Sequence, residues 1–418
     1  MIVFLLFLIF ISKVSISFLG VFPKELGPLI YQYGMHPYVN MFLNFTVGGL
    51  IYLKWFWKPN PINGQSRFYK LLIFFTCTYL LFITMLQCLF VNPEESSVLQ
   101  MAAALMAVFT IYLYGRIIPA TLKPEKFVLT IKFITVFLCL VSLAMLFISS
   151  GTSFKGARFI GVFKHIPHMV SCATLACFGI YYSLFAQKPT RIGLGINYFY
   201  LLVCFCVLIL TGTRSALAAV LLGYCLCLIF FQASSWTSRF LKISLALSAF
   251  LVVIFFGHDM ADYAIGVIRG EQAIGNRAAQ DGLKSRLEEI ERGYELFKQN
   301  EWLGSGLLMK FSNGQEAEVS GYSANKDPHN LFVSAGVLGG WGFVVLSLIG
   351  FLSLTLATIK SLFSKNHAIR LIAIYMLMNL PILLIYHVHL SLGGIADRIY
   401  WIVIGYMALN EANLKKEI

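Results

Sequence analysis

Residues 327–343 read DPHNLFVSAGVLGGWGF, a short polar cluster followed directly by a long apolar run. Pro328 fixes the backbone before His329, and Asp327 and Asn330 are residue types that cap helices. We therefore expect a membrane helix to begin near residue 329, with the histidine at its N-terminal edge. An imidazole at the water interface can exchange protons. A histidine at a helix mouth is more often a capping or interfacial residue, so its role depends on what else lies on that side of the membrane.

The composition is that of a membrane protein. Of 418 residues, 58% are hydrophobic and 12% are charged, and the mean hydropathy is +0.77. A soluble domain has about 25% charged residues. The formal net charge is +13, but the Lys and Arg residues are spread through short gaps between apolar runs. Nucleic-acid binding would need them clustered on one soluble face, so we expect no nucleic-acid partner.

Windows of about 20 residues predict an all-α, polytopic membrane helix bundle with about twelve transmembrane helices. We expect residues 1–418 to form a single membrane domain, with a large outer loop at 258–329 between spans nine and ten. The first span resembles a signal-peptide core, but no small-residue cleavage site follows it, so we expect it to remain a membrane helix. The predicted spans lie near 2–22, 36–56, 70–91, 98–118, 127–149, 168–187, 193–211, 213–232, 239–257, 330–358, 367–387 and 391–410.

The loops alternate in charge. Every second loop, and the C-terminal tail, is rich in Lys and Arg, whereas the loops between them are not. Basic loops stay in the cytoplasm, so we expect both termini to be cytoplasmic and the other loops to lie outside. The outer set includes the loop around 150–167, the turn at 211–214 and the long loop 258–329.

Several kinds of active site are missing from the sequence. The nine cysteines all fall in apolar runs, so we interpret them as small core residues and not as a disulfide or metal set. There is no phosphate-binding loop, no H-E-x-x-H, no G-x-S-x-G and no outer pair of carboxylates with a metal spacing. We therefore predict no metal and no other cofactor.

What remains is a group of basic residues in the outer loops. Arg158 and Lys164 lie before the sixth span, and Arg214 lies in the tight turn between spans seven and eight. An arginine in such a hairpin costs free energy unless it is paired or functional, although it can also serve as an interfacial anchor. Arg286 lies on the amphipathic segment 281–300, where it could equally be a solvated charge.

The amphipathic segment repeats apolar residues at helical spacing, from Leu283 to Phe297, which predicts a helix lying on the bilayer surface or over the spans. The sequence Trp302-Leu303-Gly304-Ser305-Gly306 then predicts a flexible turn.

Arginines and a histidine on the outer face of the membrane suit a reaction in which a phosphate-type leaving group is held and an attacking hydroxyl loses its proton. A guanidinium is permanently charged and binds phosphate oxygens in pairs. A neutral imidazole can take a proton from an attacking hydroxyl. Fixed cations in a shielded site can stabilise a departing diphosphate without a metal ion.

Three segments resemble the signature blocks of the O-antigen ligase and O-antigen polymerase superfamily. They are RFIGVFKHIPHMVS (158–171), LTGTRSALAAV (210–220) and DPHNLFVSAGVLGGWG (327–342). The pattern S-R-L-x-x-x-E-R-G-Y at 285–294, followed by W-L-G-x-G at 302–306, resembles the outer loop of that family. The resemblance implies a polytopic bacterial inner-membrane enzyme with a periplasmic active site that acts on undecaprenyl-diphosphate-linked glycans.

The resemblance also implies roles for residues at matching positions. Arg214 and Arg286 match the essential arginines, which engage the diphosphate of the lipid-linked donor. His329 matches the essential histidine, which activates or orients the acceptor hydroxyl. We expect these three to be catalytic, and a second set to bind substrate, consisting of Arg158, Lys164 and Asn330. The chain departs from the family at His165 and His168, where an Asn-Pro-Asn motif is usual, so their role stays open.

The function predicted first is that of an O-antigen ligase, which moves polysaccharide from undecaprenyl diphosphate to a sugar of lipid A–core. A polymerase that joins repeat units on the same lipid would need the same residues. Length, span number and one long late loop favour the ligase. A transporter or lipid flippase would show matched repeats with broken helices, which the sequence lacks. A purely structural membrane protein would leave Arg214 without a purpose.

Overall fold

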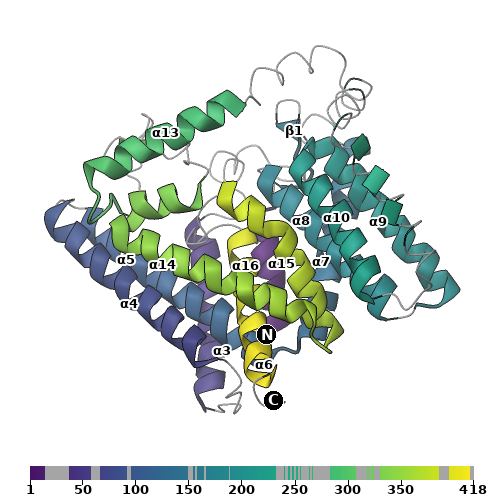
Figure 1. Ribbon diagram of the computed structural model, residues 1–418, viewed down its shortest axis with the longest axis horizontal. Coiled ribbons are helices and arrows are strands. Elements are labelled where there is room, and N and C mark those ends of the chain that lie inside the picture. Colours follow the sequence, from purple (N-terminus) through teal and green to yellow (C-terminus); the bar gives the residue numbers. More distant parts are fainter. Residues whose placement is uncertain are drawn as a thin grey trace, which may run out of the picture. The chain divides into compact units, whose positions relative to one another are not determined.

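The computed structural model describes most of the chain, and the statements below concern those residues. They are 1–14, 37–57, 66–91, 96–148, 154–155, 158–163, 166–187, 189–231, 283–306, 318–319, 322–323, 330–385 and 395–414, with isolated residues between 240 and 266. Helices dominate (Figure 1). The strands form two hairpins, β1 (Phe154–Lys155) with β2 (Arg158–Phe159), and β3 (Glu318–Val319) with β4 (Tyr322–Ser323).

Within the described residues, seven helices are long and apolar enough to cross a membrane. The predicted class, an all-α polytopic membrane protein, is therefore confirmed, whereas the predicted number of twelve spans is not. Most of the predicted span near 239–257 and part of that near 2–22 fall outside what the structure describes. The seven are Arg67–Phe90, Gln100–Thr121, Pro124–Phe147, Ile166–Ala186, Arg191–Thr211, Arg214–Phe231 and Leu331–Leu362.

The chain divides into two compact units. The first comprises Met1–Pro61, Thr121–Ala279 and Leu362–Met378, and the second comprises Ile62–Ala120, Gln280–Ser361 and Asn379–Ile418. In the first unit, α8 touches α7, α9 and α10, and it is the most deeply buried of the seven spans. The helices of this unit are α1 (Ile2–Ile11), α3 (Pro37–Trp57), α7 (Pro124–Ile148), α8 (Ile166–Tyr181), its π-helical continuation η4 (Tyr182–Ala186), α9 (Arg191–Thr211), α10 (Arg214–Phe231) and most of α15 (His367–Ile385).

Small residues let α8 approach its neighbours closely, as is usual between membrane helices. A Cβ atom added to Gly179 would lie 2.6 Å from the Cβ of Lys132, and one added to Gly223 of α10 would lie 2.5 Å from the ring of Phe178. Most cysteines of this unit are also small residues of its core. The buried free thiols are those of Cys139, Cys172, Cys177, Cys204, Cys225 and Cys227. Cys206 is exposed, so the expectation that every cysteine is a core residue is wrong there.

Lys132 places an amine inside the span formed by α7. Its Nζ donates hydrogen bonds of 2.7 Å to Ser183 Oγ in η4 and to Asn197 Oδ1 in α9. Asn197 in turn donates from Nδ2 to the carbonyl of Gly193 at 2.8 Å. Polar groups inside a membrane pair with one another or with backbone carbonyls. This three-helix cluster thus joins α7, η4 and α9 through neutral oxygens.

The second unit is built around a close crossing of two helices. A Cβ atom on Gly405 would lie 2.3 Å from the carbonyl oxygen of Gly115, and the Tyr69 hydroxyl donates to that same oxygen at 3.0 Å. The glycines therefore allow the backbones to touch. The helices are α4 (Arg67–Phe90), α5 (Ser96–Tyr112) continued by the π-helix η3 (Leu113–Ile117) and α6 (Ile118–Thr121), α13 (Leu283–Gln299), α14 (Leu331–Leu362) and α16 (Ile395–Leu414).

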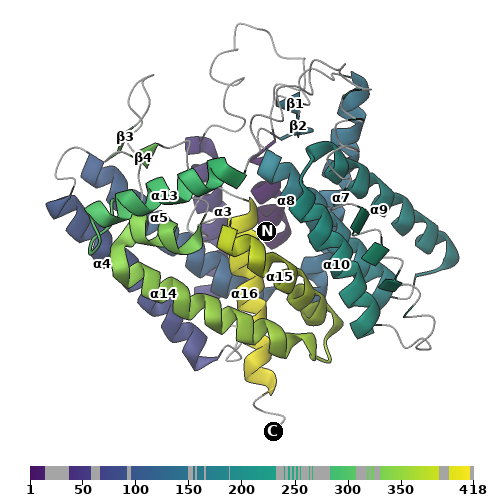
Figure 2. The same cartoon turned by 45° about the horizontal axis from the view of Figure 1, so that its top comes forward.

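The helix α14 is two helices joined by a sharp reversal. The backbone is non-helical at Gly339 (φ −148°, ψ 22°) and Gly340 (φ 67°, ψ −167°). The rings of Phe332 and Phe351 lie 6.3 Å apart, whereas 19 residues of straight helix would separate them by about 28 Å. The first segment therefore folds back along the second (Figures 1 and 2). Because only the second, about 33 Å long, matches the bilayer core, the predicted single span 330–358 is corrected.

Candidate functional site

The turn between α9 and α10 presents Arg214 at the start of a helix. Gly212 ends α9 with a φ of 66°, and the Thr211 hydroxyl donates to the carbonyl of Leu208 at 2.7 Å. The Thr213 carbonyl accepts the first helical bond of α10, from the amide of Leu217 at 3.2 Å. Arg214 is then the first residue of α10 and is exposed. The predicted position of this arginine in a tight interhelical turn is confirmed.

Arg158 lies in a hairpin that is held against the helix ends of the first unit. It pairs with Lys155 across β1 and β2 and is half-buried. Gly161 adopts a φ of 56°, and the next amide donates to Ser142 Oγ at 3.3 Å. Phe159 and Phe163 are buried on either side. The hairpin is therefore a fixed part of the unit.

Arg158 and Arg214 lie at the same end of the first unit. The helices alternate in direction, so α7 and α9 end where α8 and α10 begin, and β2 packs against α9. Figure 2 shows the hairpin at that end of the helices. The half-buried His168 also belongs to this end, whereas Lys164 and His165 lie outside the described residues.

The helix α13 carries Arg286 and forms as predicted. Leu287 and Tyr294, which the helical spacing assigns to its apolar face, are 58% and 46% exposed within the protein. Leu296 and Phe297, in the C-terminal turn of α13, are buried and pack with Val337 of α14. Whether this apolar face lies on the bilayer surface or over the spans stays a prediction. The side chain of Arg286 lies outside what the structure describes, so its convergence with Arg214 stays a prediction.

The turn at 301–306 is a docked segment and not the flexible turn that its glycines predict. The amide of Ser305 donates to the carbonyl of Val337 at 2.6 Å, and the amide of Trp341 donates to the carbonyl of Glu301 at 2.8 Å. A Cβ atom on Gly340 would lie 2.1 Å from the carbonyl oxygen of Trp302. The glycine-rich turn and the reversal of α14 therefore meet backbone to backbone.

Two polar side chains of α4 also bind this junction. Gln87 Nε2 donates to the carbonyls of Leu303 and Leu338, at 2.5 Å and 2.7 Å. The Tyr79 hydroxyl donates to the carbonyl of Gly339 at 2.7 Å. Sequence reasoning missed both residues. The signal was present, since an amide and a phenol two helical turns apart in an apolar span need partners.

Asn330 begins the first segment of α14. Its Oδ1 accepts hydrogen bonds from the amides of Phe332 and Val333, at 3.0 Å and 3.1 Å. The predicted helix start near residue 329 is therefore confirmed, with Asn330 as its cap. A substrate-binding role of Asn330 stays a prediction, and only its amide nitrogen is left for it. His329 and Asp327, directly before the cap in the sequence, lie outside the described residues.

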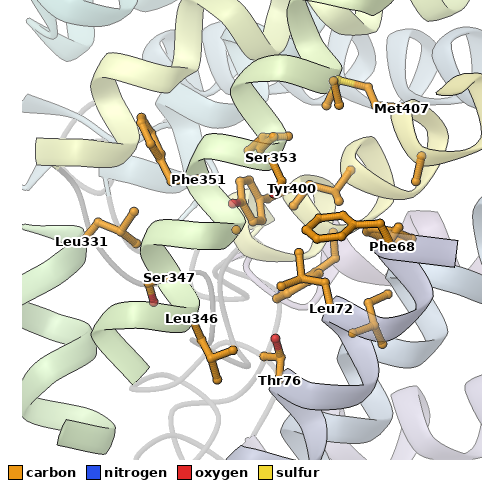
Figure 3. A pocket seen from close by; sticks show the side chains of 18 of the residues that line it. Phe68, Leu72, Thr76, Leu331, Leu346, Ser347, Phe351, Ser353, Tyr400 and Met407 are labelled. Atoms are coloured by element: carbon orange, nitrogen blue, oxygen red, sulfur yellow. The ribbon is translucent and has the colours of Figure 1, made fainter. Parts of the chain in front are cut away.

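An apolar cavity of about 120 Å³ lies beside this cap, between α4, α14 and α16. Leu331, the residue after Asn330, is part of its wall (Figure 3). Its few polar lining groups include Thr76, Ser347 and Ser353. A lining of this kind suits a hydrocarbon group and not a sugar.

The described residues thus define a polytopic α-helical membrane protein with candidate basic residues at helix ends. Residues 199–349 match the family described as O-antigen ligase, which confirms the resemblance to the O-antigen ligase and O-antigen polymerase superfamily. The match takes in Arg214, Arg286, His329 and Asn330 and leaves out Arg158 and Lys164. No curated protein matches the sequence. Proteins of this family are glycosyltransferase-like ligases and polymerases, so the match supports an enzyme that acts on lipid-linked glycans in a membrane.

Proposed function

We propose that this protein is an O-antigen ligase. It transfers polysaccharide from undecaprenyl diphosphate to a sugar hydroxyl of lipid A–core, on the periplasmic face of the bacterial inner membrane. The observation that carries the proposal is the family match over residues 199–349, which contains all three candidate catalytic residues. The polymerase remains the alternative, because joining repeat units on the same lipid requires the same residues.

In this reaction the acceptor hydroxyl attacks the anomeric carbon of the first donor sugar. The bond from that carbon to the diphosphate oxygen breaks, and undecaprenyl diphosphate leaves with the electron pair. The hydroxyl proton passes to the neutral imidazole of His329. No metal ion enters this sequence of steps, because Arg214 and Arg286 offset the charge on the leaving diphosphate.

The local structure of Arg214 supports its part in this scheme. It is the first residue of α10, where the free amide groups and the dipole of the helix favour an anion. Its guanidinium is exposed and can bind two phosphate oxygens at once. Arg158, at the same end of the unit, adds a second cation for the negatively charged donor. We assign Lys164 and Asn330 to substrate binding with it.

A deletion of the gene, followed by electrophoresis of lipopolysaccharide, tests the function. A ligase defect removes all polymer from lipid A–core while lipid-linked polymer persists. A polymerase defect leaves single repeat units in both pools. Unchanged lipopolysaccharide with both pools intact would overturn the proposal.

We also propose that both termini lie in the cytoplasm, and cysteine labelling tests this orientation. A cysteine at Gly314 should react with an impermeant reagent added from outside, and a cysteine at Lys365 should not. Lys365 is exposed and its neighbour Ser364 is buried, so only the former reports the side of the membrane. The reverse labelling pattern would place the candidate site in the cytoplasm.

A further inference from the structure

The Gln87 side chain joins two segments of the second unit that are far apart in sequence. It is 0% exposed, and its Nε2 donates to the carbonyls of Leu303 and Leu338. Only the nitrogen of a carboxamide can donate to a carbonyl, so these two bonds fix the orientation of the group. One neutral side chain on α4 therefore binds the turn after α13 and the reversal of α14 together.

The carbonyls of Leu303 and Leu338 both need a hydrogen-bond donor from another segment of the chain. Leu338 is the last residue before the non-helical pair Gly339 and Gly340, and a carbonyl at a helix end has no partner within its helix. Leu303 lies in the turn that follows α13. The buried amide satisfies both groups without adding a charge, which a lysine or arginine would bring into the core.

The two joined segments lead to the candidate catalytic residues. Arg286 lies on α13, whose last residue is Gln299, four residues before Leu303. His329 and Asn330 directly precede the first segment of α14, which ends at Leu338. Both segments are rigid helices, so fixing their adjacent ends sets the direction in which each extends. The backbone bonds from Ser305 to Val337 and from Trp341 to Glu301 join the same two segments, whereas the apolar contact of Phe297 with Val337 has no such directionality.

We propose that Gln87 is a positioning residue that sets the direction of α13 relative to the first segment of α14, and so the backbone position of Arg286 relative to Asn330, which His329 directly precedes in the sequence. This inference rests on the proposed glycosyl transfer. A displacement of about 1 Å can lower a rate by about 10²-fold. Loss of the amide should therefore act on kcat while the KM values for donor and acceptor stay near those of the parent protein.

The first experiment compares Gln87→Met with Gln100→Met in the purified full-length protein. Methionine keeps the volume of glutamine and removes the donor. Gln100, on α5, is 1% exposed and also lies beside Gly306, but its amide is not the one that binds Leu303 and Leu338. We expect kcat to fall about 10- to 100-fold for Gln87→Met and less than twofold for Gln100→Met. Unchanged kcat for Gln87→Met, or equal losses in both, would overturn the proposal.

A crosslink measures the position of the helices without any activity. A Cβ atom at Gly336 would lie 2.7 Å from Cδ2 of Phe297, so the pair Phe297→Cys and Gly336→Cys comes within disulfide reach. We expect this disulfide to form more slowly when Gln87→Met is added, and its closure to restore kcat. An unchanged rate of closure overturns the positioning role. Absence of transfer by the parent protein would instead refute the proposed function, while the crosslink still reports on Gln87.

Discussion

Two glycine-containing turns, one in each unit, differ in which residues supply the hydrogen bonds that close them. The turn at Gly212 is closed by residues next to it in the sequence, with bonds from Thr211 to Leu208 and from Leu217 to Thr213. The turn at Gly304 has one local bond, from its own amide to the Asn300 carbonyl at 2.7 Å, and is otherwise closed by residues from other helices, including Gln87 and the Val337 carbonyl. The first turn presents Arg214, and the second lies between Arg286 and His329 in the chain.

The difference predicts how each turn responds to change. A turn closed by its own neighbours forms whenever the two flanking helices form, so it resists substitutions elsewhere. A turn closed by distant partners depends on the packing of every helix that supplies one. The position of Arg214 should therefore tolerate substitutions in other helices. The position of the turn at Gly304 should be sensitive to substitutions far from the candidate catalytic residues.

The largest contrast is expected between Gly340→Ala and Gly212→Ala. Gly212 is in the left-handed helical conformation, which costs an alanine about 1–2 kcal/mol, whereas Gly340, with φ 67° and ψ −167°, is in a conformation that essentially only glycine adopts. At Gly340 the new methyl group would also lie 2.1 Å from the carbonyl oxygen of Trp302, which is backbone and cannot turn aside. We expect Gly340→Ala to prevent the accumulation of folded protein, and Gly212→Ala to lower the melting temperature in detergent by a few degrees. Equal effects would show that the second turn is not backbone-packed.

The next largest effect is expected for substitutions of His329, the proposed general base. General-base assistance is worth about 10²- to 10⁴-fold, so His329→Ala should lower kcat by that factor while membrane insertion and melting temperature stay unchanged. Protonation removes the lone pair of an imidazole, so transfer by the parent protein should also fall as the pH is lowered. His329→Gln keeps hydrogen bonding without a base. Near-normal transfer by that variant would leave His329 only an orienting role.

A smaller loss is expected for Arg214→Lys. Lysine keeps the charge but cannot bind two phosphate oxygens side by side, and a hydrogen bond to a charged group is worth about 1.5–3 kcal/mol. We expect transfer to fall about 10- to 100-fold, and Arg286→Lys to act similarly. Assays with purified lipid-linked donor would measure both. Full activity in both variants would remove the diphosphate-binding role.

The smallest contrast compares single hydrogen bonds in the two turns. Tyr79→Phe removes the bond to the Gly339 carbonyl and retains the stacking on Phe343, at a ring separation of 6.2 Å. Thr211→Val removes the bond to the Leu208 carbonyl. We expect about 1 kcal/mol of destabilisation for Tyr79→Phe and a smaller one for Thr211→Val, because the Tyr79 bond joins two helices whereas the Thr211 bond joins residues of one helical turn. A larger effect at Thr211 in thermal melting would contradict the comparison.

The sequence predicts the features that depend on neighbouring residues. Apolar windows of about 20 residues predict the spans that the structure describes, and the polar residue before an apolar run predicts Asn330 as the cap of α14. It does not predict the reversal at Gly339 and Gly340, because hydropathy is the same on both sides of the break. Nor does helical spacing show that Leu287 is exposed, since it marks an apolar face without saying what covers it.

The Lys132 cluster has a consequence for biosynthesis. Its partners Ser183 and Asn197 lie 51 and 65 residues further along the chain. At about 5–20 residues per second, the second partner is made about 3–13 s later. A lysine at the centre of an inserting helix costs about 2.5–3.5 kcal/mol at the translocon. Lys132 is the ninth of the 25 residues of α7, so its cost is at most of this size, and α7 must enter the bilayer before that cost is offset. We expect Lys132→Met to improve insertion of chains that end after α7 and to leave chains that end after α9 unchanged.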